Sequence, residues 1–408
     1  MANALTPMSP TYWSRIMGAK LYKANVFRNI ASFREEAVLT DGQKVDRPYR
    51  SDVYIQPYVK GTALTAQDIT ANSDQLTVDK IFAALIYVDD VDKIQNKWDA
   101  ASAWSQEIVE RLSNQIDADC LYSSAYEAND SVDYNDLDSN QTAGLPIVLT
   151  TSNVLNMFAV TARKLSVNNV GGANRFFAIS PQVKQVLLTY LAGRESILGD
   201  KTGEAGMIGR YMGFDLFETN NLTAHIRITP ASAGNDTETL VINGLTLTFE
   251  ATPATSSATA FSVDVGTTAA EITDLVAIIN STTAVSSATV GISPTGSGLA
   301  AMQRSWFAVD GTTYVDIYIK GASQIATLTG TATSWMTTNV TFYKQLNVAG
   351  EKKAVDLVIQ KNPSVKMAST VSAGKDGMNI LPKTLYACGV FYDMQARLFR
   401  VEVDSSVF

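Results

Sequence analysis

The chain has 408 residues, of which 46% are hydrophobic and 18% charged, and its formal net charge is −8. This length favours two or three subdomains with cores of their own, and the globular composition, without an apolar run of about 18 residues, predicts no membrane span. The acidic balance, without a block of Lys or Arg, argues against strong binding to DNA phosphates.

The first 48 residues predict an N-terminal arm with a short helix, because their apolar residues follow only a loose helical pattern. The chain does not open on a basic segment followed by an apolar one, so we expect no secretory signal and synthesis in the cytosol. Residues 49–90 contain two strand-like apolar runs around a polar middle, Gly61 to Asp74. They predict two long strands joined by a mobile polar tip, and Pro57 favours an edge position for the first strand.

The strongest helical pattern extends from about Asp99 to Tyr126, where apolar residues recur at spacings of three and four. The polar segment from Asn129 to Gly144 predicts a solvated loop, since its acids do not have the spacing of an EF-hand. An α/β pattern follows from Thr151, with a helix and then a strand over Arg175–Ile179. Ser180 before a proline predicts the start of a second helix.

The composition shifts towards Thr, Ala, Ser and Gly over residues 228–341. Asn243-Gly244 lies between two alternating runs and predicts a type I′ hairpin, and Asp310-Gly311 predicts a second hairpin. Thr268 and Glu271 have the spacing of a capping box before one short amphipathic helix. The segment therefore predicts a small, self-sufficient β-rich domain inserted into a host fold at a surface loop.

From residue 342 to residue 408 the pattern of the host fold resumes. The sequence EKKAVDLVIQK, residues 351–361, is helix-like, and the segments TLYACGVFY and LFRVEVD are strand-like. The chain is therefore expected to return to its first core.

Residue types that carry catalysis or bind metals are scarce. Cys120 and Cys388 have no CxxC partner, so we expect buried small side chains and neither a disulfide framework nor a zinc cluster. The only histidine, His225, leaves no His-based zinc site and no usual Ser-His-Asp triad. The glycine-rich GMIGRYMG does not complete GxGxxG and precedes its strand. We therefore expect no enzyme and no cofactor.

Three stretches, in this order, resemble tailed-phage major capsid proteins of the Hong Kong 97 type, whose fold is shared by herpesvirus capsids. Gln75 to Gln95, with the helix ending in QIDADCLYSS, is similar to the E-loop return strand, acidic hinge and spine helix of that family. NRFFAISPQVKQVLLTYL, running on to GMIGRYMGFDLFETNNL, resembles the passage from the peripheral to the axial domain. KKAVDLVIQKNPSVKM resembles the late axial helix.

The resemblance implies an α+β Hong Kong 97-type capsid fold. Its parts would be an N-terminal arm (1–48), the E-loop strand pair (49–90), the spine helix with the peripheral domain and first part of the axial domain (91–227), an inserted β-rich domain (228–341), and the rest of the axial domain with the return to the peripheral domain (342–408).

The function implied is that of a major capsid protein of the virion. Copies would form hexamers and pentamers of an icosahedral shell around double-stranded DNA, without sequence-specific contact, in the bacterial host cytoplasm. The implied partners are the portal protein, a separate scaffolding protein, since no long extension precedes the arm, and a decoration or cement protein as a further candidate. No membrane partner is expected.

A long strand pair with a poorly buried tip, and an arm without a core, need partners for their backbone groups and edges. We expect inter-subunit contacts from Lys60, Gly61, Thr62, Asp68 and Asn72 in the loop and from Trp13 and Phe27 in the arm. In some relatives an E-loop lysine forms an isopeptide bond, but a charged contact is the favoured interpretation of Lys60.

Two other classes remain open at this stage. In a phage tail or adhesive protein, the Thr/Ala-rich domain would bind a ligand, although only one such unit is present. An enzyme is less favoured, because the sequence contains no recognisable nucleophile and base, metal cluster or phosphate loop. A purified chain that stays monomeric would favour these alternatives.

Overall fold

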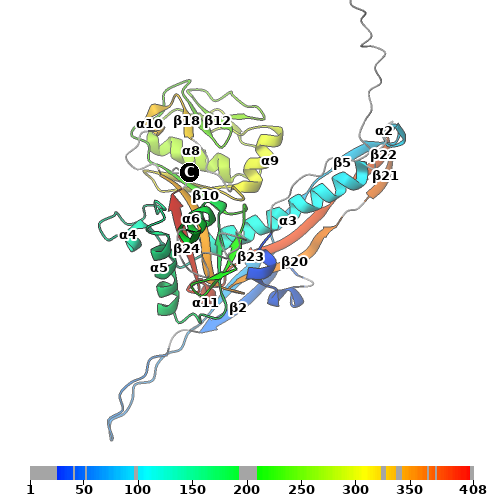
Figure 1. The fold of residues 1–408 in the computed structure, drawn as a ribbon. Coiled ribbons are helices and arrows are strands. Elements are labelled where there is room, and N and C mark those ends of the chain that lie inside the picture. Colours follow the sequence, from blue (N-terminus) through cyan, green and yellow to red (C-terminus); the bar gives the residue numbers. More distant parts are fainter. Residues whose placement is uncertain are drawn as a thin grey trace, which may run out of the picture.

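The computed structural model describes residues 25–39, 42–50, 53–95, 100–192, 209–322, 328–336, 342–364, 367–372 and 375–404. The described strands form sheets of two, three, four, six and nine strands, with helices packed against them. Figure 1 shows a central body, a long extension that contains helix α3, and a β-rich part above the body that contains α8 and α9.

Helix α3 (Ala100–Tyr126) confirms the predicted long helix and connects the extension to the body. Its buried side includes Ile116, Cys120 and Leu121, which are at most 1% exposed and join the core formed with β20 and β23. Before it lie α1 (Phe27–Ile30), β1 (Ala31–Ser32), the 3₁₀ helix η2 (Arg34–Ala37) and α2 (Asp90–Gln95).

A nine-stranded sheet forms the body. Its strands are β6 (Asp130–Val132), β7 (Arg175–Ile179), β8 (Arg210–Tyr211), β9 (Phe214–Glu218), β10 (Thr223–Ile228), β16 (Trp306–Asp310), β17 (Val315–Ile319), β19 (Phe342–Glu351) and β24 (Leu398–Asp404). The helices α5 (Val154–Val167) and α6 (Pro181–Ala192) share an apolar core with this sheet. The predicted strand before Ser180 is β7, and the predicted helix start is confirmed, since Ser180 Oγ accepts a hydrogen bond from Val183 N at 3.2 Å.

The segment predicted to be a solvated loop contains structure. Strand β6 is followed by α4 (Tyr134–Leu137), and Asp133 caps this helix by accepting a hydrogen bond from Asp136 N at 3.1 Å. Asp133 also accepts one from Gly144 N at 2.6 Å. The acids of this segment therefore bind backbone groups, a use that composition alone does not reveal.

Three further, smaller sheets are present. One has the order β1, β20 (Val355–Ser364), β23 (Lys383–Gly389) and β4 (Lys80–Ala83); another pairs β2 (Lys44–Arg50) with β3 (Ala71–Thr77); the third joins β5 (Ile86–Asp89), β21 (Met367–Ser372) and β22 (Lys375–Ile380). The short helix α11 (Tyr392–Gln395) lies between β23 and β24.

The helix predicted over residues 351–361 is wrong. The chain turns at Lys352 and Lys353, whose φ is +69°, and then forms β20 between β1 and β23. Val355, Leu357 and Val358 are all fully buried, so both faces of this strand are covered. A short apolar run that is buried on both faces has no alternation to distinguish it from a helix.

The segment predicted as an insertion forms the six-stranded sheet. Its elements are β11 (Thr239–Ile242), β12 (Leu245–Glu250), β13 (Ala260–Asp264), α8 (Thr268–Asn280), β14 (Ser286–Ser287), β15 (Gly291–Ile292), α9 (Gly296–Ser305), β18 (Leu328–Gly330) and α10 (Thr333–Met336). The first predicted hairpin is confirmed, because Asn243 and Gly244 have φ of +47° and +83° between β11 and β12.

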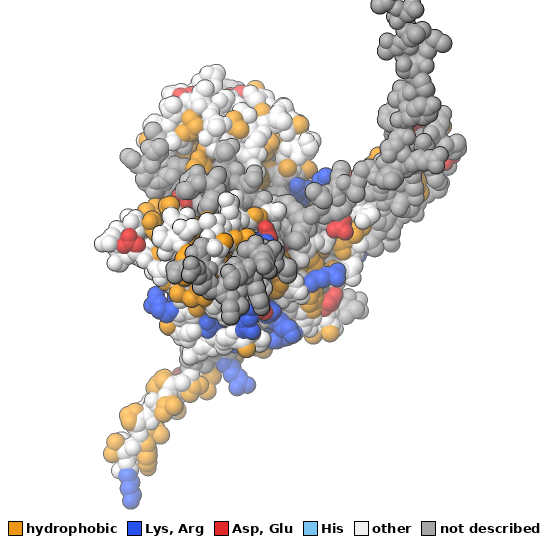
Figure 2. Space-filling model, in the orientation of Figure 1, with side chains coloured by type: hydrophobic (Ala, Val, Ile, Leu, Met, Phe, Trp, Pro, Cys, Tyr) orange, Lys and Arg blue, Asp and Glu red, His pale blue; other side chains and the backbone are white. Residues whose placement is uncertain are grey.

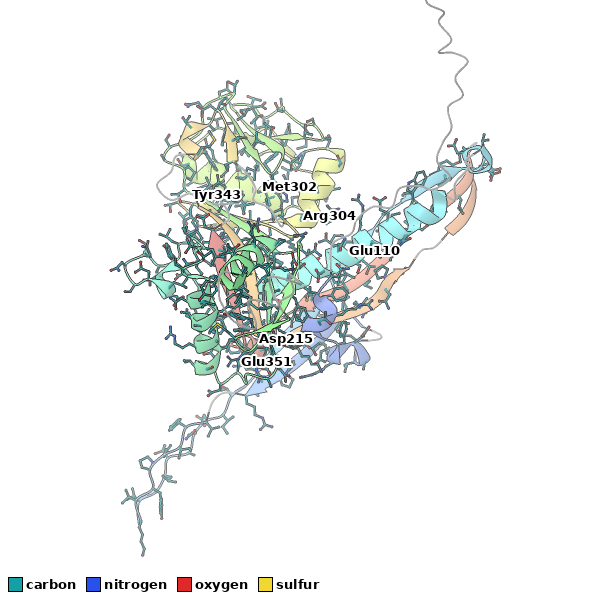
Figure 3. All side chains as sticks on the ribbon, in the orientation of Figure 1. Glu110, Asp215, Met302, Arg304, Tyr343 and Glu351 are labelled. Atoms are coloured by element: carbon teal, nitrogen blue, oxygen red, sulfur yellow. The ribbon has the colours of Figure 1, made fainter. Side chains whose placement is uncertain are left out.

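The segment was expected to be a self-sufficient domain, but it shares a sheet and an apolar core with the body. The second hairpin, β16–β17, is present but pairs with β10 and so extends the sheet of the body. Ile226 and Ile228 of β10 lie in the same apolar core as the insertion, together with fully buried Met302 of α9 (Figure 3). The predicted single helix is accompanied by two further helices, α9 and the short α10.

The predicted capping box at the start of α8 is also wrong. Thr267 is the N-cap, with its hydroxyl accepting from Ala270 N at 3.3 Å. Glu271 is fully buried and instead accepts hydrogen bonds from Gly234 N at 3.0 Å, Gly266 N at 3.3 Å and Trp335 Nε1 at 3.2 Å. The Glu271 carboxylate therefore joins the beginning of the insertion, the segment before α8, and helix α10.

We predict that Glu271→Ala destabilises the insertion by at least about 3 kcal/mol, because three donors lose their acceptor and each costs about 1–3 kcal/mol. Urea unfolding of unassembled subunits, followed by tryptophan fluorescence, would measure this loss. The control is Glu238→Ala, since the side chain of Glu238 is half-buried and bonds only to nearby Asn235 in its described hydrogen bonds. Equal stability of the two variants would contradict the role of Glu271.

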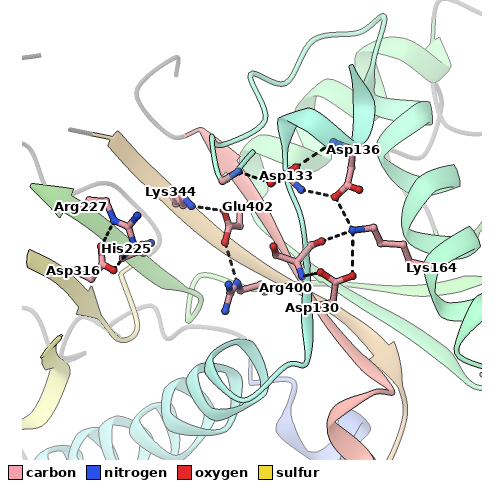
Figure 4. Close-up of polar contacts among 12 residues, drawn as sticks. Asp130, Asp133, Asp136, Lys164, His225, Arg227, Asp316, Lys344, Arg400 and Glu402 are labelled. Carbon is pink, nitrogen blue, oxygen red and sulfur yellow. Dashed lines mark hydrogen bonds and ion pairs between the residues drawn. The ribbon is translucent and has the colours of Figure 1, made fainter. Parts of the chain in front are cut away.

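Charged side chains on neighbouring strands of the nine-stranded sheet form ion pairs (Figure 4). Arg227 on β10 donates to both carboxylate oxygens of Asp316 on β17, at 2.6 and 2.7 Å, and His225 Nε2 lies 3.0 Å from Asp316 Oδ1. Lys344 on β19 pairs with Glu402 on β24. Burial opposes ionisation of Asp316, but the hydrogen bonds from Arg227 and His225 outweigh it and lower its pKa to about 2.

We predict that His225 makes the fold less stable in mild acid. Burial lowers the pKa of His225 below 6.5, and this effect exceeds the opposing influence of Asp316. Stability is therefore lost as the pH falls from about 6.5 towards the folded-state pKa. The free energy of unfolding of the wild type should decrease relative to that of His225→Gln between pH 7 and pH 5. Parallel pH profiles for the two proteins would refute this.

Candidate assembly surfaces

The most exposed part of the described chain is the segment of residues 53–70, here called the projecting loop. It leaves the body between β2 and β3 and contains no strand, so the predicted strand pair reaches only Arg50 and Ala71 (Figures 1 and 3). The loop turns at Lys60 and Gly61, where Thr62 N donates to Val59 O at 3.0 Å and Gly61 has φ of +90°.

Glutamine side chains bridge the two legs of the projecting loop. Tyr54 N donates to Gln67 Oε1 at 3.3 Å, and Gln56 Nε2 donates to Thr65 O at 3.1 Å. These side chains take the place of a backbone ladder, so much of the backbone of the loop is open to further partners.

The projecting loop exposes large apolar side chains, most of which lie before its turn in the run that was predicted as a strand. Large apolar side chains that are 57–97% exposed occur along it: Val53, Tyr54, Ile55, Tyr58, Val59, Leu64 and Ile69. Figure 2 shows the loop as a thin extension covered mainly by hydrophobic side chains, with a basic side chain at its end. Contiguous apolar surface of this kind is typical of an interaction site.

The predicted loop residues are not all at its tip. Lys60, Gly61 and Thr62 form the turn and are exposed, and Asp68 lies on the returning leg. Asn72 belongs to β3, where it is opposite Tyr49, and is therefore part of the base of the loop.

The base of the projecting loop is fastened to the body by residues that sequence reasoning missed. Arg47 lies 3.1 Å from Asp393 and 3.5 Å from Asp356, and its guanidinium lies 4.9 Å from the centre of the Phe391 ring. Asp74 accepts a hydrogen bond from Tyr392 N at 2.9 Å. Because these partners are about 300 positions apart in the sequence, no local pattern could have indicated them.

The N-terminal arm is only partly described. Phe27 is 3% exposed and packs into the core of its own chain, which corrects its prediction as an inter-subunit contact. Val26 N and Phe27 N both donate to Asp117 Oδ1 of α3, at 2.9 and 2.8 Å. Trp13, the other predicted contact of the arm, lies outside the described residues.

A pocket of about 510 Å³, here called the basal pocket, opens beside the base of the projecting loop. Residues of β3, β4, α3, β16, β23 and α11 line it, together with Lys320 after β17. Lys320 Nζ lies 3.0 Å from Asp119 Oδ1, and Tyr386 OH donates to the other oxygen of the same carboxylate. Glu127 accepts a hydrogen bond from Val390 N at 2.5 Å, and burial raises the pKa of Glu127 to about 6.

The described residues contain no group of three or more His, Cys, Asp or Glu side chains that could hold a metal ion, and none of their helices is long and apolar enough to cross a membrane. Cys120 and Cys388 are both buried and free, as predicted.

Comparison with solved structures identifies the fold. No protein-family model matches the sequence, and no curated protein does. The chain is similar to one in a structure of Mycobacterium phage Che8, with a TM-score of 0.57 and 12% identity over 96% of each chain. It is also similar to one in the capsid structure of the Cyanophage P-SCSP1u, with a TM-score of 0.55, 13% identity, and 99% of this chain and 96% of that chain covered. The chain therefore has a phage capsid fold, which confirms the predicted fold class.

Proposed function

We propose that the chain is the major capsid protein of a tailed phage. Its copies form hexamers and pentamers of an icosahedral shell around double-stranded DNA, and the protein is a structural component of the virion and not an enzyme. The projecting loop is the observation that carries this proposal. A chain with a phage capsid fold presents an apolar loop that its own body leaves exposed.

The energetics of the projecting loop favour contact between copies. Complete burial of one large apolar side chain contributes about 1.5–3 kcal/mol. Seven such side chains are exposed on this one loop, so covering even some of them would stabilise a contact substantially. In a closed shell each copy both offers a loop and receives one, so many moderate contacts add together.

The expected organisation fits this role. The arm (1–48) and the E-loop pair (49–90) would join neighbouring copies, while residues 91–227 and 342–408 would form the wall of the shell. Residues 228–341 would be an insertion fixed to that wall through β10. A portal protein, a separate scaffolding protein and a decoration or cement protein are the further partners of the proposal, and the bacterial cytoplasm is the place of assembly.

A tail or adhesive protein is the less favoured alternative. The similarity to the two phage structures extends over 96–99% of this chain, which leaves little of the Thr/Ala-rich segment outside the match and favours the capsid proposal.

We predict that the double variant Ile55→Asp/Tyr58→Asp assembles at least about tenfold less than the wild type, because charges replace apolar contacts worth more than about 1.4 kcal/mol. Ile55 is 97% exposed and Tyr58 is 66% exposed, so the subunit itself should fold normally. Sedimentation and negative-stain electron microscopy of shells would measure the effect, and circular dichroism would check the fold.

The matched control for this experiment is Val167→Asp. Val167 is 70% exposed at the end of α5, outside the projecting loop. If the loop variant yielded as many shells as this control, the loop would not be an assembly contact.

A further inference from the structure

The basal pocket has the chemistry of a site for a cation with apolar neighbours. Aromatic rings of Tyr122, Tyr126 and Phe307 line it, and Lys320 Nζ already lies 4.6 Å from the centre of the Tyr122 ring. Val390 and Phe391, between β23 and α11, add apolar side chains to its wall. Such rings attract ammonium and guanidinium groups through their faces. At about 510 Å³, the pocket is large enough for a side chain and the residues next to it.

The charges of the basal pocket are unequal. Three carboxylates and two ammonium groups line it: Asp74, Asp79 and Glu127, and Lys80 and Lys320. The two lysines are already engaged, since Lys320 pairs with Asp119 and Lys80 Nζ donates to Cys388 O at 3.4 Å. The pocket therefore retains an excess of negative charge on the side of Asp79 and Glu127.

Glu127 would gain from a second cation beside it, in addition to Lys80, whose charge already lowers the pKa of Glu127 in part. Its carboxylate is partly buried, and burial raises the pKa of Glu127 to about 6, so its ionised form at neutral pH is held at a cost. A nearby ammonium group would offset this cost, because an opposite charge within about 4–6 Å favours the ionised form.

The projecting loop offers such a cation. Lys60 is its only basic residue, lies at the turn and is exposed. Its neighbours Tyr58 and Val59 are 66% and 65% exposed, so the ammonium group is presented together with apolar surface. This combination matches the aromatic and acidic lining of the basal pocket.

The loop does not bring Lys60 to the pocket of its own chain. Strand β3 lines the pocket, and the loop extends away from this base (Figure 1). The ten residues from Arg50 to Lys60 span up to about 33–36 Å when extended. Over this distance from the base of the loop, Lys60 can contact a neighbouring copy.

We propose that the basal pocket of one copy receives the Lys60 side chain of a second copy, with the ammonium group near Asp79 and Glu127 and with Tyr58 and Val59 against the aromatic wall. This inference rests on the proposed function, because it needs a second copy beside the first. It adds the receiving site, which connects the loop of one subunit to the spine helix and insertion of the next.

Charge exchange tests the contact. Lys60→Glu and Asp79→Lys should each lower the yield of shells at least about tenfold, and the double variant should recover to within about threefold of the wild type. Both residues are exposed, so these changes should leave folding intact. Lys60→Glu/Asp68→Lys is the matched control: it restores the net charge of the loop without changing the pocket, and it should stay defective.

Two outcomes would overturn the inference. One is a Lys60→Glu variant that assembles like the wild type, and the other is recovery in the Asp68 control that equals recovery in the pocket double variant. In both cases the proposed function would stand, because shells would still form. A wild type that forms no shells under any condition would instead refute the proposed function itself.

Direct proximity gives a second test. In assembled shells of Lys60→Cys/Asp79→Cys, mild oxidation should join subunits into covalent oligomers on a non-reducing gel, whereas Lys60→Cys alone should not form them. Because Cys388 lines the basal pocket, both proteins also carry Cys388→Ser, and the other native cysteine, Cys120, is fully buried. Monomers only, from intact shells of the double variant, would contradict the contact.

Discussion

Two buried carboxylates of α3 connect the parts of this molecule. Asp117 accepts hydrogen bonds from the backbone of Val26 and Phe27 and from Asn221 Nδ2 at 2.7 Å. It therefore joins the N-terminal arm and the segment before β10 to helix α3. Asp119, two positions further on, pairs with Lys320 and accepts from Tyr386. Both carboxylates are at most 1% exposed, and a buried carboxylate is tolerated only when such partners surround it. The helix therefore holds the insertion and the small sheets in one arrangement.

This arrangement gives the projecting loop a rigid origin. Arg47 and Asp74 fasten its base to α11, and α11 leads directly into β24 of the body sheet. The loop itself has apolar side chains and a sparse backbone ladder, so its order depends on what covers it. A firm base with an uncovered end suits a subunit that completes its structure only when it joins others.

The insertion is continuous with the sheet of the body. Strand β10 pairs with β17 on one side and with β19 on the other, so the sheet of the body continues into the inserted segment. Arg304, at the end of α9, lies on the side of the insertion that faces α3 (Figure 3), and its carbonyl accepts from Gln115 of that helix at 3.3 Å. The low charge of the segment fits a part that is supported mainly through its core and through this face.

Sequence reasoning worked where the signal was local. The period of α3, the turn residues Asn243-Gly244 and the Ser180 cap each depend on neighbouring positions, and all are present. It failed at β20, because a strand buried on both faces has no alternation. It also failed for Glu271 and Phe27, whose partners are set by tertiary contacts.

The candidate site shows the same limit. The sequence indicated that residues 49–90 form a strand pair with an exposed tip and that Lys60 lies there. It did not indicate that the leg before the tip is an exposed apolar segment without a strand, because Tyr54, Ile55 and Tyr58 were predicted to belong to an edge strand. The basal pocket combines residues from both ends of the chain and from the insertion, and only the folded structure brings these together.

The most direct test of the account is negative-stain electron microscopy of the wild-type protein, expressed alone and together with a scaffolding protein. The account predicts closed shells, tubes or rings of five and six subunits. Dispersed monomers under every condition would contradict the central claim that this fold and its uncovered loop serve the assembly of a capsid.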